Sequence, residues 1–273
     1  MREPKVFYYS DELNDDFATT KELVGKPIGE DFPYIHRNPL WRAAAAVLYR
    51  GIVTPIVFLY CKLLFGLRIK GKKQLRGLKY GYFLYANHTQ HAADAFIPTL
   101  VSFPKKAYIV TGASAVSIPG LRNIVQMLGA IPIPDETKGL QRFSEVLKTR
   151  ISQGAAVCIY PEAHIWPYYT HIRPFRAGSF AYPADCGAPV VPYVVTYRER
   201  RLLKRLHPCI TVRIGEPIFP DPSVPNRKER HRLRDAAFAY MHETAERTEQ
   251  PEYIRYVFRE KDAQDDLHDA GSL

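Results

Sequence analysis

Short apolar runs alternate with stretches of helical spacing through the middle of the chain. A continuous apolar run is typical of a strand buried on both faces, whereas apolar residues at every third or fourth position indicate a helix. The predicted strands are residues 67–70, 82–86, 107–110, 129–133, 155–160, 189–195 and 210–214, and the predicted helices are residues 92–100, 118–128 and 138–151. This alternation predicts an α/β fold with a mixed, mostly parallel sheet flanked by helices.

The two ends of the chain differ from this middle part. Residues 1–39 are polar, acidic and broken by prolines, which predicts an irregular arm, and their first residues do not resemble a signal peptide. Residues 260–273 form an acidic tail. We therefore expect an arm at 1–39, an N-terminal membrane-associating helical segment at 40–66, an α/β domain at 67–259 and the tail.

The segment at residues 40–66 is rich in aromatic and apolar residues. A single-pass helix needs about 20 mostly apolar residues, but Arg42, Arg50 and Lys62 interrupt this one and Pro55 is expected to kink it. The pattern therefore argues against a conventional span. Aromatic residues beside cations fit helices that lie in a membrane interface. A pair of core helices packed on the domain is the alternative, because a helix that is apolar on most sides is also typical of a buried one.

Charge is unevenly distributed along the chain, whose net value is +10. Residues 1–31 hold eight acids against four bases and residues 260–273 hold five acids against one, which leaves +18 for residues 32–259. Such a block favours an anionic partner, which would be a membrane surface, a phosphorylated substrate or nucleic acid. No nucleic-acid-binding motif is visible, so no nucleic acid is expected. A basic surface that meets only solvent is the remaining explanation.

Candidate chemistry gathers where the predicted strand at residues 82–86 ends, at Asn87, His88, His91 and Asp94. A carboxylate that accepts a hydrogen bond from one ring nitrogen fixes the histidine tautomer, so that the other nitrogen can remove a proton from a hydroxyl. On one continuous helix, His88 and Asp94 would lie roughly 240° apart. His88 must therefore lie in the turn before the helix, reaching Asp94. His91 is the competing base, because it is three residues from Asp94.

Asn87-His88 followed by Asp94 after a strand resembles the first motif of the lysophospholipid and 1-acylglycerol-3-phosphate acyltransferases. That family usually places four residues between His and Asp, whereas this chain has five, which a longer turn or a π-bulge would absorb. The resemblance implies that His88 and Asp94 are catalytic and that Asn87 contacts the substrate. A turn that merely contains histidines is the alternative reading of this short motif.

A second strand ends at Tyr160-Pro161-Glu162, and Phe175-Arg176 with Gly178 follow after a gap. These residues are similar to the family's Phe-Pro-Glu-Gly-Thr and Phe-Lys-x-Gly motifs, although Ala163 and His164 replace Gly and Thr. The resemblance implies that Glu162 and Gly178 are substrate-binding, whereas a carboxylate that only ties down the loop is the alternative for Glu162. The guanidinium groups of Arg173 and Arg176 offer bidentate contacts suited to phosphate.

The remaining resemblances are weaker. The family's second motif commonly ends in a phosphate-binding Arg, and Asp135 takes that place here. Either Lys138, Arg142, Arg173 or Arg176 does its work, or the acceptor has a different head group. Residues 187–192 and 213–218 resemble the family's closing strands. The four stretches occur in the family's order between residues 82 and 218.

Nucleophilic catalysis by serine or cysteine is not indicated. The chain has no Gly-x-Ser-x-Gly elbow, and no cysteine lies beside a motif histidine. The four cysteines match no metal spacing and indicate buried, reduced thiols, so neither a metal nor a cofactor is expected.

The resemblance implies an O-acyltransferase that moves a fatty acyl group from acyl-CoA or acyl-carrier protein to a hydroxyl of a lysophospholipid. It would act on the cytoplasmic face of the cell membrane as a peripheral or monotopic protein. Two other classes stay open at this point. One is a catalytically degenerate lipid-binding protein, suggested by the altered motifs, and the other is a basic nucleic-acid-binding domain, for which only the charge speaks.

Overall fold

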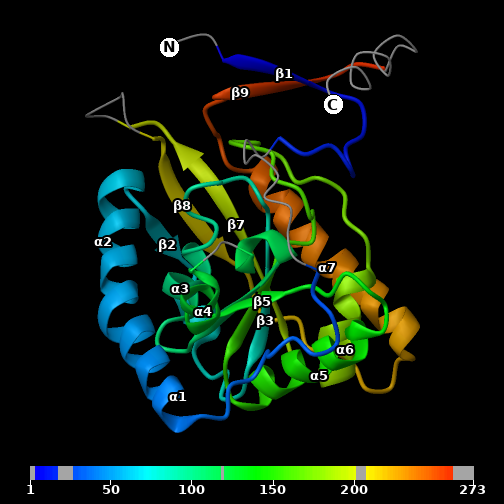
Figure 1. Cartoon of the computed structure of the whole chain (residues 1–273). Coiled ribbons are helices and arrows are strands. Elements are labelled where there is room, and N and C mark those ends of the chain that lie inside the picture. Colours follow the sequence, from blue (N-terminus) through cyan, green and yellow to red (C-terminus); the bar gives the residue numbers. More distant parts are fainter. Residues whose placement is uncertain (1–3, 18–26, 118–119, 201–206, 261–273) are drawn as a thin grey trace, which may run out of the picture.

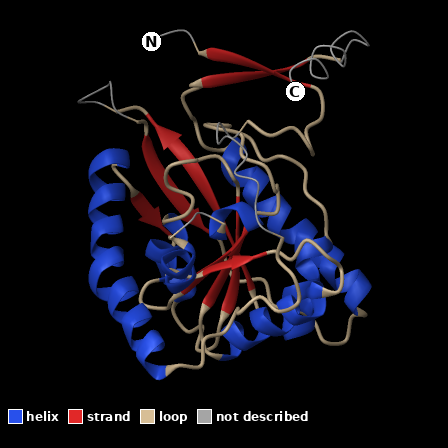
Figure 2. Cartoon of the chain, viewed as in Figure 1, coloured by secondary structure: helices blue, strands red, loops and turns tan. Residues whose placement is uncertain are grey.

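The computed structural model describes residues 4–17, 27–117, 120–200 and 207–260. In this part of the chain, seven strands form one sheet in the order β2, β8, β7, β3, β6, β4, β5. Their bounds are β2 Arg68–Lys70, β3 Tyr82–Ala86, β4 Ala107–Thr111, β5 Ala130–Pro132, β6 Ala156–Ile159, β7 Val190–Arg198 and β8 Cys209–Ile214. Only the β7–β8 pair is antiparallel (Figure 2). This mixed, mostly parallel sheet confirms the predicted fold class.

Strand β3 lies between β7 and β6 at the centre of the sheet, and all five of its residues are buried. Phe83 and Tyr85 face one apolar layer, whereas Tyr82, Leu84 and Ala86 face the other. Burial on both faces explains why the strand reads as an unbroken apolar run. The strand is thus packed on both faces up to Ala86, two residues before His88.

Helices cover both faces of the sheet (Figure 1). Residues of α5 (Gly139–Ser152), α6 (Ala181–Cys186) and α7 (Asn226–Glu246) pack on the Phe83 face. Residues of α2 (Thr54–Phe65) and α3 (Ile97–Ser102) pack on the Leu84 face, and α4 (Arg122–Met127) precedes β5. Helix α7 was not predicted because most of its residues are polar. Its buried stripe of Leu233, Ala237, Met241 and Ala245, spaced by four, was the available signal.

The segment predicted to be helical is one long helix, Pro39–Phe65, made of α1 (Pro39–Ala46), a π-helical stretch Val47–Val53 and α2. The π-helical stretch ends just before Pro55, where the hydroxyl of Thr54 donates to the carbonyl of Tyr49 at 2.6 Å. Pro55 therefore lies inside the long helix, directly after a π-helical stretch that changes the hydrogen-bonding pattern where the proline has no N–H. By length and composition this helix could cross a membrane, and one side of it packs on the domain.

The amino-terminal arm is more ordered than its polar sequence predicts. Strand β1 (Lys5–Tyr9) pairs in parallel with β9 (Ile254–Phe258), outside the main sheet (Figure 1). Ile28, Phe32 and Tyr34 are buried in the core on the α5 side. Lys5–Tyr9 thus differs from the irregular arm predicted there, because long-range pairing overrides local composition, whereas residues 27–38 have no regular secondary structure although these three side chains are buried. All but the first residue of the predicted acidic tail lies outside the described residues.

Candidate active site

His88 and Asp94 lie together at the carboxyl end of β3. The Nδ1 atom of His88 is 2.8 Å from Oδ2 of Asp94, whose carboxylate is buried. With Nδ1–H donating to the carboxylate, Nε2 is the nitrogen that can accept a proton from a hydroxyl. His91 is exposed in the same pocket, but the carboxylate of Asp94 is engaged by His88. The structure therefore brings together the predicted pair.

The extra residue between His88 and Asp94 is absorbed by a change in local structure. Residues 91–96 form successive turns, and α3 begins only at Ile97, later than the predicted start at residue 92. The backbone N–H of Gln90 donates to Oδ2 of Asp94 at 2.9 Å, and the N–H of Asp94 donates to the carbonyl of Gln90 at 2.9 Å. These reciprocal bonds close the turn so that the carboxylate reaches His88.

Tyr160, the residue directly after β6, packs against the pair. Its ring stacks on the imidazole of His88, with centroids 4.3 Å apart, and its hydroxyl donates to the backbone carbonyl of Asp94 at 2.6 Å. The hydroxyl also lies 3.3 Å from that of Tyr193. Burial raises the pKa of Tyr160 well above its usual range, so the phenol stays protonated as a donor. Sequence reasoning did not assign this residue a role; the signal was a tyrosine where the resembled motif has phenylalanine.

Glu162 fixes the turn that carries His88. Its Oε2 accepts a hydrogen bond from the backbone N–H of His88 at 3.1 Å, and its Oε1 accepts one from the N–H of Arg173 at 3.2 Å. Burial raises the pKa of Glu162, while the Arg173 guanidinium and these two N–H groups oppose that rise. Of the two alternatives left by the sequence, the contacts fit a carboxylate that ties down the loop. Glu162 also lines the pocket.

Arg173 is fully buried and does not reach the pocket, contrary to the prediction that it binds phosphate. Its guanidinium lies 3.5 Å from Oε2 of Glu162 and 4.8 Å from the ring of Trp166. It also donates to the carbonyls of Glu12 and His164. A buried cation with these partners serves the local structure. Sequence spacing could not show that Arg173 points inward while Arg176 points out.

Three other predicted substrate-binding residues are placed differently from one another. Asn87 is buried, and its amide exchanges two hydrogen bonds with the backbone of Val195 on β7, so it joins two strands and does not line the pocket. Lys138 is exposed at the start of α5 and is also absent from the pocket lining. Gly178 does line the pocket, beside the exposed Arg176. The predicted roles of Asn87 and Lys138 therefore lack geometric support.

Asp135 and Arg142 both face the amino-terminal arm. Oδ2 of Asp135 accepts a hydrogen bond from the backbone N–H of Ile28 at 2.6 Å, and Arg142 donates to the carbonyl of Glu30. The carboxylate that replaces the expected arginine thus holds the arm and does not line the pocket.

The pocket around the His88–Asp94 pair has a volume of about 680 Å³. One part of its wall is apolar, with Ile109, Val110, Ile133, Phe143 and Ile159. The polar part carries the histidines, Glu162 and Arg176, and the arm closes one side. A volume of this size suits a small or chain-like ligand, because ligand sites combine apolar walls with a few polar groups. Among the described residues, no three histidine, cysteine, aspartate or glutamate side chains lie together in a way that could hold a metal ion.

Comparison with known proteins gives a family for the central segment of the chain. The Acyltransferase family model matches residues 66–196, a range that contains the His88–Asp94 pair, Tyr160, Glu162 and Arg176. This segment belongs to the acyltransferase family. The resemblance noted in the sequence is thereby confirmed at the level of the family. No curated protein sequence matches the chain.

The acyltransferase domain also has a solved structural relative. The 1-acyl-sn-glycerophosphate (LPA) acyltransferase PlsC from Thermotoga maritima superposes with a TM-score of 0.50, over 77% of this chain and 96% of that one. The two sequences are 15% identical, so the likeness is one of fold. It agrees with the mixed sheet and flanking helices of the acyltransferase domain.

Proposed function

We propose that this acyltransferase moves a fatty acyl group from a thioester carrier to a hydroxyl of a lysophospholipid. The observation that carries the proposal is the 2.8 Å contact between His88 and Asp94 inside a pocket that is apolar on one side. The name of the structural relative, an LPA acyltransferase, supports a glycerolipid acceptor. Acyl-CoA and acyl-carrier protein are both suitable donors.

In the proposed reaction, His88 is the general base and Asp94 orients it. Nε2 of His88 removes the proton of the acceptor hydroxyl while that oxygen attacks the thioester carbonyl. Asp94 stabilises the imidazolium that forms, and Glu162 keeps the turn in place through the N–H of His88. Breakdown of the tetrahedral intermediate releases the carrier as its thiol, and the proton held by His88 passes to that sulfur.

Cys158 does not compete as a nucleophile. It lies on β6 within the core, and burial raises the pKa of its thiol to about 12. A thiol in that state is protonated at neutral pH, and the thiolate is the reactive form. Acyl transfer is therefore proposed to be direct, without an acyl-enzyme.

The acceptor is proposed to carry a phosphate, with Arg176 as its partner. Arg176 is exposed and lines the pocket beside Gly178. Among the described residues, it is the one lysine or arginine in that lining. Its planar guanidinium suits bidentate contact with a phosphate. Because Arg173 is occupied inside the fold, the phosphate hypothesis now rests on Arg176 alone.

Membrane association is proposed through the exposed side of the helix Pro39–Phe65. Ile56, Phe58, Leu59 and Leu63 are each more than half exposed there, whereas Cys61 and Phe65 are buried against the domain. This division fits a helix that is docked on the domain and immersed on its outer side in the cytoplasmic leaflet. Leu59→Ser with Leu63→Ser should lower binding to phosphatidylcholine vesicles on the order of tenfold or more, since two leucines that the membrane would bury are lost. Unchanged sedimentation with those vesicles would refute the docking.

The deciding experiment offers purified protein both thioester donors with a panel of acceptors. The panel contains lysophosphatidic acid, other lysophospholipids, monoacylglycerol and unrelated alcohols, and products are identified by mass spectrometry. His88→Ala should lower turnover at least about a hundredfold, as expected on loss of a general base. His91→Ala is the matched control and should retain activity, because the carboxylate of Asp94 is hydrogen-bonded to His88 and no hydrogen bond joins it to the His91 ring in the described structure.

Each alternative has its own result. Transfer that survives His88→Ala but not His91→Ala would reverse the assignment of the base. Preference for monoacylglycerol, with no loss on Arg176→Ala, would refute the phosphate-bearing acceptor. Lipid binding without transfer to any acceptor would favour the degenerate lipid-binding protein, and salt-dependent binding of DNA or RNA without lipid binding would favour the nucleic-acid class.

A further inference from the structure

A second cavity, of about 390 Å³, lies at the other end of the sheet from the active site. It is lined by Lys106 and Tyr108, where β4 begins, whereas Thr111, at the end of β4, lines the active-site pocket. The first turns of the long helix close one side, with Arg42 and Arg50. The two sites thus use different residues of β4, with Tyr108 lining one and Ile109 to Thr111 lining the other.

This cavity is strongly cationic. Six of the residues that line it are basic: His36, Arg37, Arg42, Arg50, Lys106 and Arg150. Among the residues that the structure describes, no aspartate or glutamate lines it. Lys106 and Arg150 are half-buried, and cations partly withdrawn from water are normally paired with carboxylates, so their place here without one is costly to the fold.

The innermost cations have only neutral partners. Lys106 donates to the carbonyl of Met127 at 2.7 Å and lies over the rings of Tyr49 and Tyr108, at 4.8 Å and 5.0 Å from their centroids. Arg150 donates to the carbonyl of Tyr34 at 3.0 Å, and its buried Nε has no hydrogen-bond partner in the described structure. Burial, with Arg150 and Arg50 nearby, lowers the pKa of Lys106 to about 8. Each of these features would be relieved by an anion.

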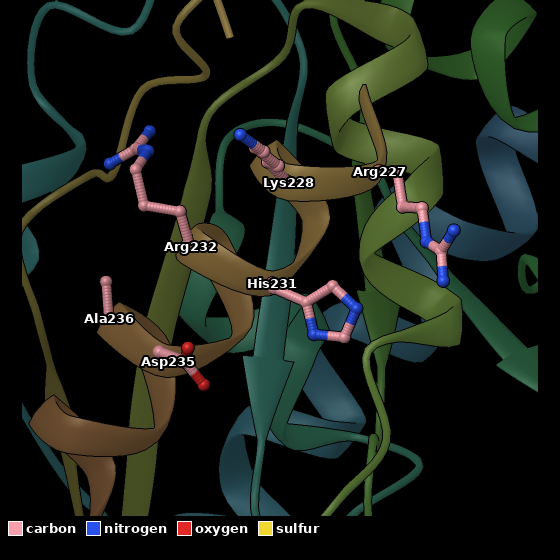
Figure 3. Close-up of a pocket in the computed structure, with 6 residues that line it drawn as sticks. All are labelled: Arg227, Lys228, His231, Arg232, Asp235 and Ala236. Atoms are coloured by element: carbon pink, nitrogen blue, oxygen red, sulfur yellow. The ribbon is translucent and has the colours of Figure 1, made fainter. Parts of the chain in front are cut away.

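A basic surface elsewhere on the molecule lacks these features. It lies at the start of α7, where Arg227, Lys228 and His231 stand apart on the outside of the helix (Figure 3). There Arg232 is paired with Glu229 at 2.6 Å, and Asp235 lies within the same surface. The carboxylates of Asp235 and Glu229 lie among these cations, and the basic side chains are exposed to water. This hollow provides a matched control for charge without half-buried cations.

We propose that the cavity between α1, β4 and α5 binds the phosphate of an anionic phospholipid, as a site distinct from the catalytic pocket. The guanidinium groups of Arg42, Arg50 and Arg150 suit bidentate contact with phosphate oxygens, and Lys106 supplies a point charge behind them.

The neighbourhood of the cavity favours a lipid over a soluble phosphate. Leu40 and Val47, on the same helix as Arg42 and Arg50, are 78% and 63% exposed. An outward apolar side beside a basic cavity matches the junction of acyl chains and headgroups in a leaflet. The helix therefore presents apolar side chains to the chains of the lipid and the cavity to its phosphate.

The test compares two double variants of the full-length protein in vesicle sedimentation. Vesicles of phosphatidylcholine, with or without phosphatidylglycerol, are the probe. Arg42→Gln with Arg50→Gln should weaken binding to the phosphatidylglycerol vesicles on the order of thirtyfold, since each basic residue near an anionic surface contributes about a factor of five. The control, Arg227→Gln with Lys228→Gln, removes the same charge from the α7 surface and should change binding by less than about threefold. All four side chains are exposed, so both variants should fold.

Lys106→Gln is a third variant, aimed at the interior of the cavity. It should weaken binding to phosphatidylglycerol vesicles about fivefold and leave binding to pure phosphatidylcholine unchanged. Equal weakening by the Arg42/Arg50 and Arg227/Lys228 pairs would overturn the proposal, because it would mean diffuse attraction without a site. Displacement by inorganic phosphate where chloride of equal ionic strength has no effect would overturn the lipid as occupant. Sedimentation does not depend on transfer activity, so this proposal and the proposed enzymatic function can fail separately.

Discussion

Tyr160→Phe is the sharpest single change that the structure offers. The variant keeps the ring that stacks on His88 and removes only the hydroxyl that donates to the carbonyl of Asp94 at 2.6 Å. That carbonyl then lacks its donor, and a buried acceptor left unsatisfied costs about 2 kcal/mol. For a chain of this size we expect Tm to fall by roughly 4–8 °C.

The catalytic effect follows from what the lost bond holds. Asp94 lies in a run of turns, not in a regular helix, so the Tyr160 hydroxyl is its tie to the sheet. Loosening that turn lets the carboxylate drift from Nδ1 of His88. A loss of about 1.4 kcal/mol in transition-state stabilisation corresponds to a tenfold fall in kcat, with KM little changed. Release of the carrier thiol, followed with a chromogenic thiol reagent, measures it.

Tyr193→Phe is the matched control. Its hydroxyl lies 3.3 Å from that of Tyr160 and 3.8 Å from Sγ of Cys158, and it has no hydrogen bond to Asp94 in the described structure. This variant should lose stability but keep its kcat. If Tyr160→Phe lost stability and retained full kcat, or if both variants lost kcat equally, the hydroxyl would have only a packing role and the reasoning would be refuted.

Two further predictions concern strain and charge. Ala163 has φ of 65°, so Ala163→Gly should raise stability by about 0.5–1 kcal/mol in thermal unfolding, because glycine adopts this conformation without strain; a lower Tm would contradict this. The folded-state pKa of Lys106 is lowered from its ordinary 10.5 to about 8, so the cost of its charge is full below pH 8 and is lost as pH rises toward 10.5. In phosphate-free buffer, Lys106→Met should therefore be more stable than the parent by about 1–2 kcal/mol at pH 7, and the gain should shrink by pH 10; a constant difference across this range would contradict it.

The sequence was informative where function depends on one strand and the turn that follows it. The apolar run before His88 and the run before Glu162 are continuous because both strands are buried on both faces, and each run ends at a residue of the site. Their polar groups meet because parallel strands end at the same edge of the sheet. Direction was harder to infer. Arg173 and Arg176 are similar in the sequence, but one lies inside the fold and the other in the pocket.

Other features depend on contacts that no local pattern encodes. The parallel pairing of Lys5–Tyr9 with Ile254–Phe258 joins segments from near the two ends of the chain. The carboxylate of Asp135, which replaces an expected arginine, accepts a hydrogen bond from the backbone N–H of Ile28 in the arm. Ala163 has a left-handed backbone conformation and stands where the resembled motif has glycine. The sequence showed this departure from the motif but not the backbone strain, because the energetic cost of a side chain depends on the φ angle of its residue.

The pairing of β1 with β9 also sets when during synthesis the pocket is completed. Leu13 and Asn14 of the arm line the pocket, and the carbonyls of Glu12 and Asp15 accept hydrogen bonds from Arg173 and from the indole of Trp166. The strand that anchors this arm is among the last described parts of the chain to leave the ribosome. A nascent chain therefore makes every strand of the main sheet and the His88 turn before β9 is available to hold the arm over the pocket.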